Sequence, residues 1–162
     1  MIISEKNIKE KIRNIKIFLF DLDGVIVLHK DRNEDELIRC MKEFTEKLEK
    51  DNYFTGIITA RNSDELTSKL SKINNCRVVT ASFNKVSKVE AIIKELNLDF
   101  DNVLYIGDDM LDIPLLQKAG IAIAPSSARR EVKRVVDFTV DVTVNGSILH
   151  SVLDLFEEKN NE

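Results

Sequence analysis

The sequence is poor in the residues that mark special structural classes. Its 162 residues include two cysteines, two prolines and five glycines. Cys40 and Cys76 are too few and too far apart for a disulfide framework or a metal-binding knot, so we expect two reduced thiols. No stretch has the proline- and glycine-rich composition of a linker, and we find no internal repeat. We therefore expect one domain spanning residues 1–162.

Charge and hydropathy exclude further classes. Lys and Arg number 24 against 28 Asp and Glu, and a net charge of −4 gives no general attraction to nucleic acid or to an anionic membrane. No apolar run approaches the roughly 20 residues of a membrane span. The first residues show no signal-peptide core, so we expect a cytoplasmic protein. The absence of a Gly-x-x-x-x-Gly-Lys motif argues against a P-loop nucleotide enzyme.

Five apolar stretches predict strands, and a weaker sixth is predicted at Asp137–Val142. Several are unbroken apolar runs without alternation, which is typical of strands buried on both faces. The five are Lys16–Phe20, Phe54–Ile58, Arg77–Val79, Asn102–Ile106 and Ile121–Ala124.

Helical patterns lie between these stretches. A lead-in helix is predicted within residues 1–14, Ser63 is a cap candidate, and residues 157–162 are predicted to fray. Strands that alternate with helices of this length predict an α/β fold with a doubly wound, Rossmann-like parallel sheet. The remaining predicted helices are Glu34–Lys50, Ser63–Ile73, Val86–Leu96, Leu111–Ala119, Ala128–Val136 and Ser147–Glu158.

Polar side chains follow four of the predicted strands. Ligands of open α/β sheets bind outside the carboxyl ends of the strands, so these positions predict a site. Their side chains are acids, a hydroxyl and an amine. They are Asp21 and Asp23 after the first strand, Thr59 after the second, Lys85 after the third, and Asp108, Asp109 and Asp112 after the fourth.

This set of side chains suits phosphoryl transfer. Several ionised carboxylates together need a cation, and an incomplete set of oxygen ligands suits Mg²⁺. An Asp carboxylate can attack phosphorus and form an aspartyl-phosphate. A second carboxylate two residues on can protonate the leaving group and then activate water. Gly24 would let the backbone turn sharply away from the site.

Four short motifs carry a family resemblance. They are DLDGV at 21–25, ITAR at 58–61, NK at 84–85 and YIGDDMLDIPLL at 105–116. In this order and spacing they resemble the motifs of the haloacid dehalogenase-like hydrolases. Nearly the whole chain is similar to the small 3-deoxy-D-manno-octulosonate 8-phosphate phosphatases and nonulosonate-phosphate phosphatases, which consist of the core domain without a cap domain.

The resemblance implies specific roles. Asp21 would be the nucleophile and a ligand of Mg²⁺, and Asp23 the general acid and base, whose backbone carbonyl also contacts the metal. Asp108 would complete the metal site. The phosphoryl group and substrate would be held by Thr59, Ala60, Arg61 and Lys85. Asp109 and Asp112 would support the site, and a homotetramer would cover it.

Two segments depart from the family pattern. After Gly24 the usual Thr-Asp-Gly of a substrate-touching flap is missing, and the chain continues with Val27–Arg32. Near the C-terminus, His150 stands where the family has an Arg. An imidazole cannot make the two-pronged contact of a guanidinium with a carboxylate. The resemblance therefore implies the phosphate chemistry and leaves the substrate open.

Several of these residues have alternative interpretations. Lys88 is an alternative to Lys85 as the phosphate-binding lysine, although Lys88 lies about 200° round the helix from Val86, toward solvent. Asp112 could cap a helix near Leu111, and Thr59 could be a plain hydroxyl at the end of a strand. His29 and His150 are typical of surface residues. A basic cluster could be a solvated helix face or an anion-attracting rim, and it consists of Arg129, Arg130, Lys133 and Arg134.

Two other functions compete with a phosphatase. A receiver domain also has a parallel sheet and a phosphorylated Asp, but its motifs come as an acid pair, the acceptor Asp, the hydroxyl and then the Lys. Here the order is acids, hydroxyl, Lys, acids, and Asp23 supplies a base for water. A catalytically idle binding or scaffold subunit is the third interpretation, although every residue the chemistry needs is present.

Overall fold

The computed structural model describes residues 5–28 and 33–161, which form one α/β domain. Six parallel strands make one sheet in the order β3-β2-β1-β4-β5-β6. All six predicted strands are present, including the weaker sixth. Their bounds are β1 Ile17–Phe20, β2 Phe54–Ile58, β3 Arg77–Val79, β4 Val103–Ile106, β5 Ile121–Pro125 and β6 Phe138–Val140.

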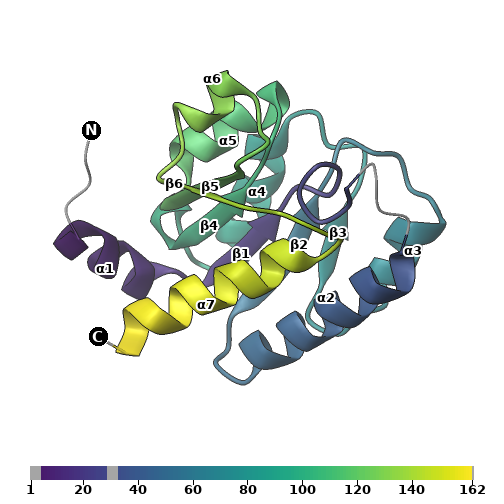
Figure 1. The fold of residues 1–162 in the computed structure, drawn as a ribbon, viewed down its shortest axis with the longest axis horizontal. Helices are drawn as coiled ribbons and strands as arrows, with labels where there is room; N and C mark the ends of the chain where they lie inside the picture. The colour runs from purple at the N-terminus through teal and green to yellow at the C-terminus, as the bar shows by residue number, and fades with distance from the viewer. Residues whose placement is uncertain (1–4, 29–32, 162) are drawn as a thin grey trace.

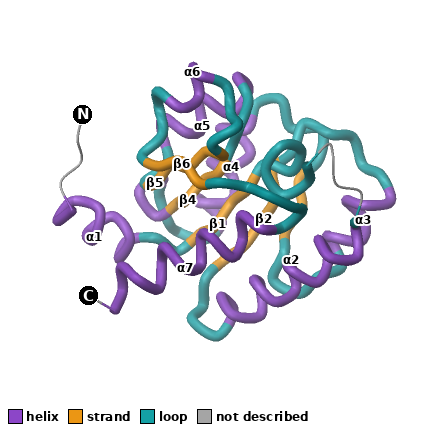
Figure 2. Tube along the Cα trace, in the orientation of Figure 1, coloured by secondary structure: helices purple, strands orange, loops and turns teal. Residues whose placement is uncertain are grey.

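Helices cover both faces of the sheet, as Figures 1 and 2 show. The core on one face includes side chains of α1 (Glu5–Asn14), α2 (Glu34–Glu49), α3 (Glu65–Ser71) and α7 (Ser147–Asn161). The core on the other face includes side chains of α4 (Lys85–Glu95), α5 (Ile113–Lys118) and α6 (Arg130–Lys133). All residues of β1, β4 and β5 are buried, which explains the unbroken apolar runs of these strands. The predicted doubly wound sheet is confirmed.

The strand order reverses between β1 and β4. The chain proceeds from β1 outward to β2 and β3, and then returns to the other side of β1 for β4, β5 and β6. β1 and β4 pair in parallel from Ile17 with Val103 to Phe20 with Ile106. Their carboxyl ends therefore lie side by side at a topological switch point, which is where this class of fold binds ligands.

Several helix ends differ from the prediction. α3 is capped by Asp64 rather than Ser63, because Asp64 and Thr67 form a reciprocal capping box. A 3₁₀ turn, η2 (Met110–Asp112), takes up the start of the predicted Leu111–Ala119 helix, so α5 begins at Ile113, ahead of Pro114. α6 is a single turn. A second 3₁₀ turn, η1 (Phe100–Asn102), precedes β4.

The fraying predicted for residues 157–162 stays a prediction, although α7 continues through Asn161 in the structure. Its last turns are anchored to neighbouring elements. Phe156 is buried and packs edge-on against Phe18, with ring centroids 5.2 Å apart, and against Tyr53 at 5.6 Å. Glu157 forms an ion pair of 2.7 Å with Lys47 of α2. The sequence does not show these long-range partners.

We expect Phe156→Ala to lower the free energy of unfolding by roughly 3–5 kcal/mol, because it empties a buried aromatic site. Val144→Ala is the control, since Val144 is an apolar residue that is 49% exposed and leaves no cavity. Urea denaturation of both variants measures the difference. Equal stability of the two variants would show that α7 is not anchored through Phe156.

Candidate active site

The carboxyl ends of neighbouring strands bring the predicted acids together. Asp21 follows β1 directly, and its backbone N–H donates to the Ile106 carbonyl at 2.9 Å, which continues the ladder to β4. Asp108 lies two residues beyond Ile106. The carboxylates of Asp21, Asp108 and Asp112 each offer an oxygen within 4.8 Å of the others. The sheet thus gathers three acids on one spot.

Burial destabilises the ionised forms of the carboxylates in this cluster. Asp21 is 8% exposed, and burial together with the charge of Asp112 raises its pKa to about 8, against the opposing pull of Lys85. Burial and Asp112 likewise raise the pKa of Asp108 to about 6, although a hydrogen bond with Asp21 opposes the shift. Carboxylates with raised pKa values would be ionised by a nearby cation.

Lys85 supplies one positive charge to the cluster. It is 3% exposed and its Nζ lies 3.0 Å from Asp21 Oδ1 and 2.6 Å from Asp112 Oδ1. Burial disfavours the ammonium, but Asp21 and Asp112 outweigh it and raise the Lys85 pKa. Lys85 is the first residue of α4 rather than a loop residue, and Asn84 caps that helix. Lys88, its rival, is exposed.

Asp112 binds the surrounding chain with both carboxylate oxygens. Its Oδ1 accepts from Lys85 Nζ and from the Tyr105 hydroxyl, each at 2.6 Å. Its Oδ2 accepts the backbone N–H groups of Asp108 at 3.0 Å and Asp109 at 3.2 Å. A carboxylate offers about four acceptor positions, so Asp112 has none left for a metal. Asp109 caps the 3₁₀ turn, and Asp112 is its partner in the capping box rather than the cap itself. Asp112 also holds Lys85.

The donor set that remains fits a hard divalent cation. Asp21 and Asp108 offer carboxylate oxygens, and open coordination positions would be left for water and a phosphate oxygen, as Mg²⁺ prefers. The Asp23 carbonyl, expected as a third ligand, is in the turn that follows β1.

Glycine is required in that turn. Gly24 has a φ of +82°, and a Cβ there would lie 1.9 Å from Asp108 Oδ2. The Asp108 side chain thus occupies the space of the absent side chain and reaches toward Asp21. Backbone N–H groups of Ile26 and Val27 donate to the Leu22 carbonyl at 3.0 and 2.9 Å and close the turn. The sequence prediction of a sharp turn at Gly24 is confirmed.

The Asp23 side chain is paired with Arg61, a contact that the sequence did not reveal. Arg61 Nε donates to Asp23 Oδ2 at 3.1 Å and Arg61 Nη2 to Asp23 Oδ1 at 2.6 Å. Arg61 Nη1 also donates to Asp64, the cap of α3, at 3.1 Å. Arg61 was expected to contact substrate. Its position shortly after β2, the strand beside β1, was the available signal, because adjacent strand ends bring such side chains together.

Thr59 and Ala60 follow β2 directly and precede Arg61 in the chain. Thr59 is 1% exposed, and its Oγ1 accepts the Arg61 backbone N–H at 3.1 Å. Its own hydroxyl proton can therefore be donated to a bound group. Ala60 is half-buried and can offer only its backbone.

The segment that follows the turn is tied to the start of α7. Leu28 N–H donates to Asn145 Oδ1 at 2.8 Å, and Gly146 N–H donates to the Ile26 carbonyl at 2.9 Å. Leu28, in the segment that departs from the family pattern after Gly24, thus contacts Asn145, five residues before His150. His29 and the rest of 29–32 lie outside the described residues.

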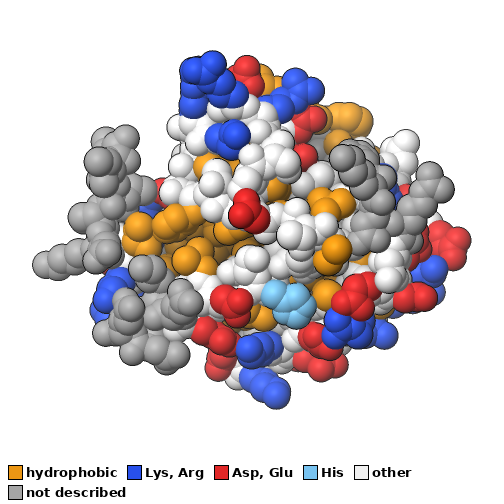
Figure 3. All heavy atoms as spheres, viewed as in Figure 1, with side chains coloured by type: hydrophobic (Ala, Val, Ile, Leu, Met, Phe, Trp, Pro, Cys, Tyr) orange, Lys and Arg blue, Asp and Glu red, His pale blue; other side chains and the backbone are white. Residues whose placement is uncertain are grey.

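Other charged candidates lie away from the cluster. His150 is exposed, and its Nε2 lies 3.6 Å from Cys40 Sγ on α2. The four members of the basic cluster are exposed over α6, where Figure 3 shows basic side chains gathered. Arg129 of this cluster forms an ion pair of 3.0 Å with Asp109. This contact places the basic cluster beside the loop that carries Asp108.

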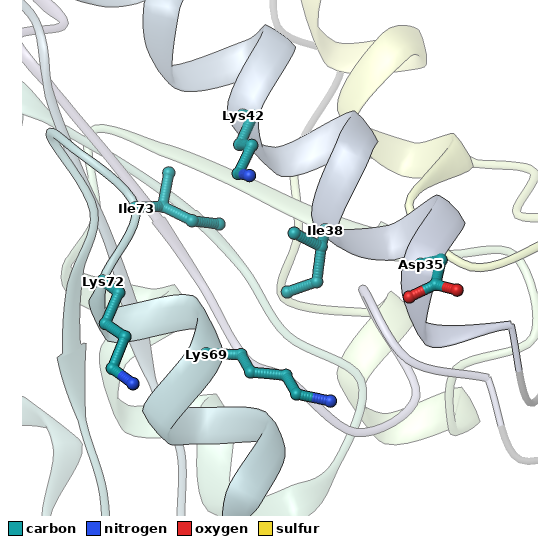
Figure 4. Close-up of a pocket in the computed structure, with 6 residues that line it drawn as sticks. All are labelled: Asp35, Ile38, Lys42, Lys69, Lys72 and Ile73. Carbon is teal, nitrogen blue, oxygen red and sulfur yellow. The ribbon is translucent and has the colours of Figure 1, made fainter.

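A cavity of about 340 Å³ lies between α2 and α3. Ile38 and Ile73 line it together with three exposed lysines and Asp35. In Figure 4 the amines of Lys42, Lys69 and Lys72 point in different directions, and Lys69 pairs with Glu65 at 3.1 Å. These charges do not converge on one point, in contrast to the groups around Lys85.

Comparisons with known proteins agree with this fold. The family model described as haloacid dehalogenase-like hydrolase matches residues 2–152. The 3-deoxy-D-manno-octulosonate 8-phosphate phosphatase of Salmonella typhi is 24% identical over 162 residues, covering 92% of this chain and 82% of the relative. That of Escherichia coli strain K12 is 24% identical over 158 residues, covering 90% and 80%.

Solved structures share the fold. The Moraxella catarrhalis 3-deoxy-D-manno-octulosonate 8-phosphate phosphatase, solved with magnesium, phosphate and KDO, has a TM-score of 0.78 at 18% identity and covers 96% of this chain and 93% of its own. The cobalt-bound Haemophilus influenzae phosphatase has a TM-score of 0.77 at 20% identity, with 93% and 92% covered. Because the family model matches nearly the whole length, this chain belongs to the haloacid dehalogenase-like hydrolases.

Proposed function

We propose that this chain is a Mg²⁺-dependent phosphomonoesterase that acts through an aspartyl-phosphate on a small phosphorylated metabolite. The observation that carries the proposal is the buried ammonium of Lys85, 3.0 Å from Asp21 within a cluster of three acids. A carboxylate nucleophile beside a fixed cation is what phosphoryl transfer requires, since catalysis rests on positioning and on neutralising phosphate oxygens.

The chain's own residues supply each step. An Asp21 oxygen attacks phosphorus while the bond to the leaving oxygen breaks, and Asp23 donates a proton to that oxygen. Asp23 then takes a proton from water, which attacks the phosphorus and releases phosphate, restoring Asp21. Thr59 and Lys85 donate hydrogen bonds to the phosphoryl oxygens. Mg²⁺, held by Asp21, the Asp23 carbonyl and Asp108, would neutralise charge that Lys85 alone does not balance.

The expected substrate is a sugar-acid phosphate of the 3-deoxy-octulosonate 8-phosphate or nonulosonate 9-phosphate type. The names of the curated relatives and the KDO bound to the Moraxella catarrhalis structure support this choice. Arg61 and Ala60 line the approach from β2 and are the proposed substrate contacts. Because Arg61 already binds Asp23, a substrate carboxylate has to share or displace that pair.

We also propose a cytoplasmic homo-oligomer, a tetramer by family resemblance. Large apolar side chains are exposed in loops that follow β3 and β4, with Phe83 at 68% and Met110 and Leu111 at 48% each. A neighbouring subunit could bury them and cover the open site. Within the described part of the chain, no helix has the length and hydropathy needed to cross a membrane.

We expect Asp21→Asn to abolish phosphate release, because the amide keeps the shape and removes the nucleophile. Asp109→Asn is the control, since Asp109 is a neighbouring acid that pairs with Arg129 at the surface. The assay is phosphate release from a panel of sugar-acid, sugar and nucleotide phosphates, with Mg²⁺ or with excess chelator. Turnover by Asp21→Asn would refute the mechanism, and full activity in chelator would refute the metal.

We expect Mg²⁺ to raise the melting temperature more at pH 8 than at pH 5. Without metal, the folded chain holds a proton on Asp21 up to a pKa of about 8, whereas the unfolded chain releases it near 3.8, so this group lowers stability as pH rises between them. Mg²⁺ needs the ionised carboxylates and competes with those protons. Thermal unfolding at subsaturating Mg²⁺ measures the shift, and Asp108→Asn should remove it. An equal shift at both pH values would contradict the assignment of Asp21.

We expect Arg61→Ala to lower kcat/KM for a sugar-acid phosphate by about 10- to 100-fold, the worth of hydrogen bonds to a charged group. A neutral hexose phosphate should lose less, because it lacks the carboxylate. Arg129→Ala is the matched control, since Arg129 also pairs with a carboxylate near the site. Equal losses on both substrates would show that Arg61 acts through Asp23 and does not recognise the acid.

A further inference from the structure

The Lys85 ammonium has three N–H donors, and the structure provides three acceptors for them. They are Asp21 Oδ1 at 3.0 Å, Asp112 Oδ1 at 2.6 Å and the Tyr105 hydroxyl oxygen at 3.2 Å. Since the three donors of an ammonium point in fixed tetrahedral directions, fixing two of them sets the direction of the third. Tyr105 and Asp112 are fully buried, with 0% exposure each, whereas Asp21 faces the site.

Tyr105 is also tied to Asp112 directly. Its hydroxyl donates to Asp112 Oδ1 at 2.6 Å, so one hydroxyl both accepts from Lys85 and donates to the carboxylate that Lys85 binds. Burial, the charge of Asp112 and the hydrogen bond to Asp112 all raise the pKa of Tyr105 and keep its hydroxyl protonated. Tyr105, Lys85 and Asp112 therefore form a closed triangle of hydrogen bonds beneath the site.

We propose that Tyr105 is a positioning residue for catalysis, which aims the third N–H of Lys85 at the phosphoryl group on Asp21. This inference rests on the proposed function. When Asp21 carries the phosphoryl group, the donor that now meets Asp21 is the one free to bind a phosphoryl oxygen. The donors to Tyr105 and Asp112 stay in place and prevent the ammonium from turning away from the site.

The backbone makes this arrangement rigid. Tyr105 lies in β4, between the paired strands β1 and β5, and its ring is packed in the core under α4 and α5. The Lys85 Nζ lies 5.9 Å from the centre of the Tyr105 ring. Phenylalanine at this position would keep the ring and its packing and would remove only the hydroxyl. The hydroxyl can therefore be tested separately from the side chain's contribution to the core.

The test is a double-mutant cycle with Tyr105→Phe and Lys85→Ala, assayed with para-nitrophenyl phosphate and Mg²⁺. We expect Tyr105→Phe alone to lower kcat by up to about 100-fold, the effect of a catalytic group displaced by about 1 Å. Inhibition by inorganic vanadate should weaken in parallel, with little change in KM. In the Lys85→Ala background, Tyr105→Phe should change kcat by less than about twofold, because the group it positions is gone.

Two matched controls separate positioning from stability. Tyr53→Phe removes the hydroxyl of the other tyrosine, which packs against Phe18 and Phe156 on the opposite face of the sheet. Lys88→Ala removes a surface lysine of the same helix. Neither should change kcat or vanadate inhibition. Loss of melting temperature in Tyr105→Phe with unchanged kcat per folded molecule would overturn the proposal, as would an equal loss of kcat in both backgrounds.

Failure of the proposed function would be visible separately. A wild-type protein that hydrolyses no phosphomonoester would refute the phosphatase, and crystal structures would then decide the role of Tyr105. Movement of Lys85 Nζ away from Asp21 in Tyr105→Phe supports positioning, and an unchanged contact overturns it. If Tyr105→Phe does not fold, Asp112→Asn replaces it in the cycle, because it weakens the same triangle. Additive effects with Lys85→Ala would then refute the inference.

Discussion

The structure depends on holding several carboxylates together in a poorly solvated place. Asp21, Asp108 and Asp112 lie within 4.8 Å of one another, and Lys85 brings one positive charge among them. One ammonium cannot neutralise three ionised acids, so the folded chain raises the pKa of Asp21 and Asp108. The uncompensated negative charge of this site favours the binding of a second cation. Its preference for a divalent metal follows from the charges of the chain itself.

The parallel sheet explains how the chain can impose this arrangement. Backbone pairing of β1 with β4 fixes Asp21 beside the Asp108 loop, and Gly24 leaves room for the Asp108 side chain. Asp112 fixes the same loop through two backbone N–H groups. Lys85 begins α4, the helix that follows β3, and its side chain joins the same network. Three segments that are distant in the sequence, the end of β1, the start of α4 and the loop after β4, therefore meet through buried and part-buried hydrogen bonds.

The sequence predicted the sheet and the members of the cluster because both leave local signals. Unbroken apolar runs mark buried strands, and polar residues at their ends mark the site. The sequence did not predict how those members pair. The bonds from Arg61 to Asp23 and from Lys85 to Tyr105 join residues 38 and 20 positions apart, and they depend on side-chain directions that no periodicity encodes. The anchoring of α7 through Phe156 was missed for the same reason.

The structure holds the nucleophile Asp21 and the proposed acid and base Asp23 in different ways. This difference affects how the substrate preference of such an enzyme can change. The nucleophile and Lys85 are fixed by buried partners, so substitutions near them disturb folding and chemistry together. Asp23 is held by Arg61, whose side chain is 28% exposed and whose other partner, Asp64, lies at the surface. Ile26 and Leu28 bond to the segment before α7 through contacts outside the acidic cluster. Selection among substrates can therefore vary through these outer contacts while the buried triangle of Tyr105, Lys85 and Asp112 stays constant.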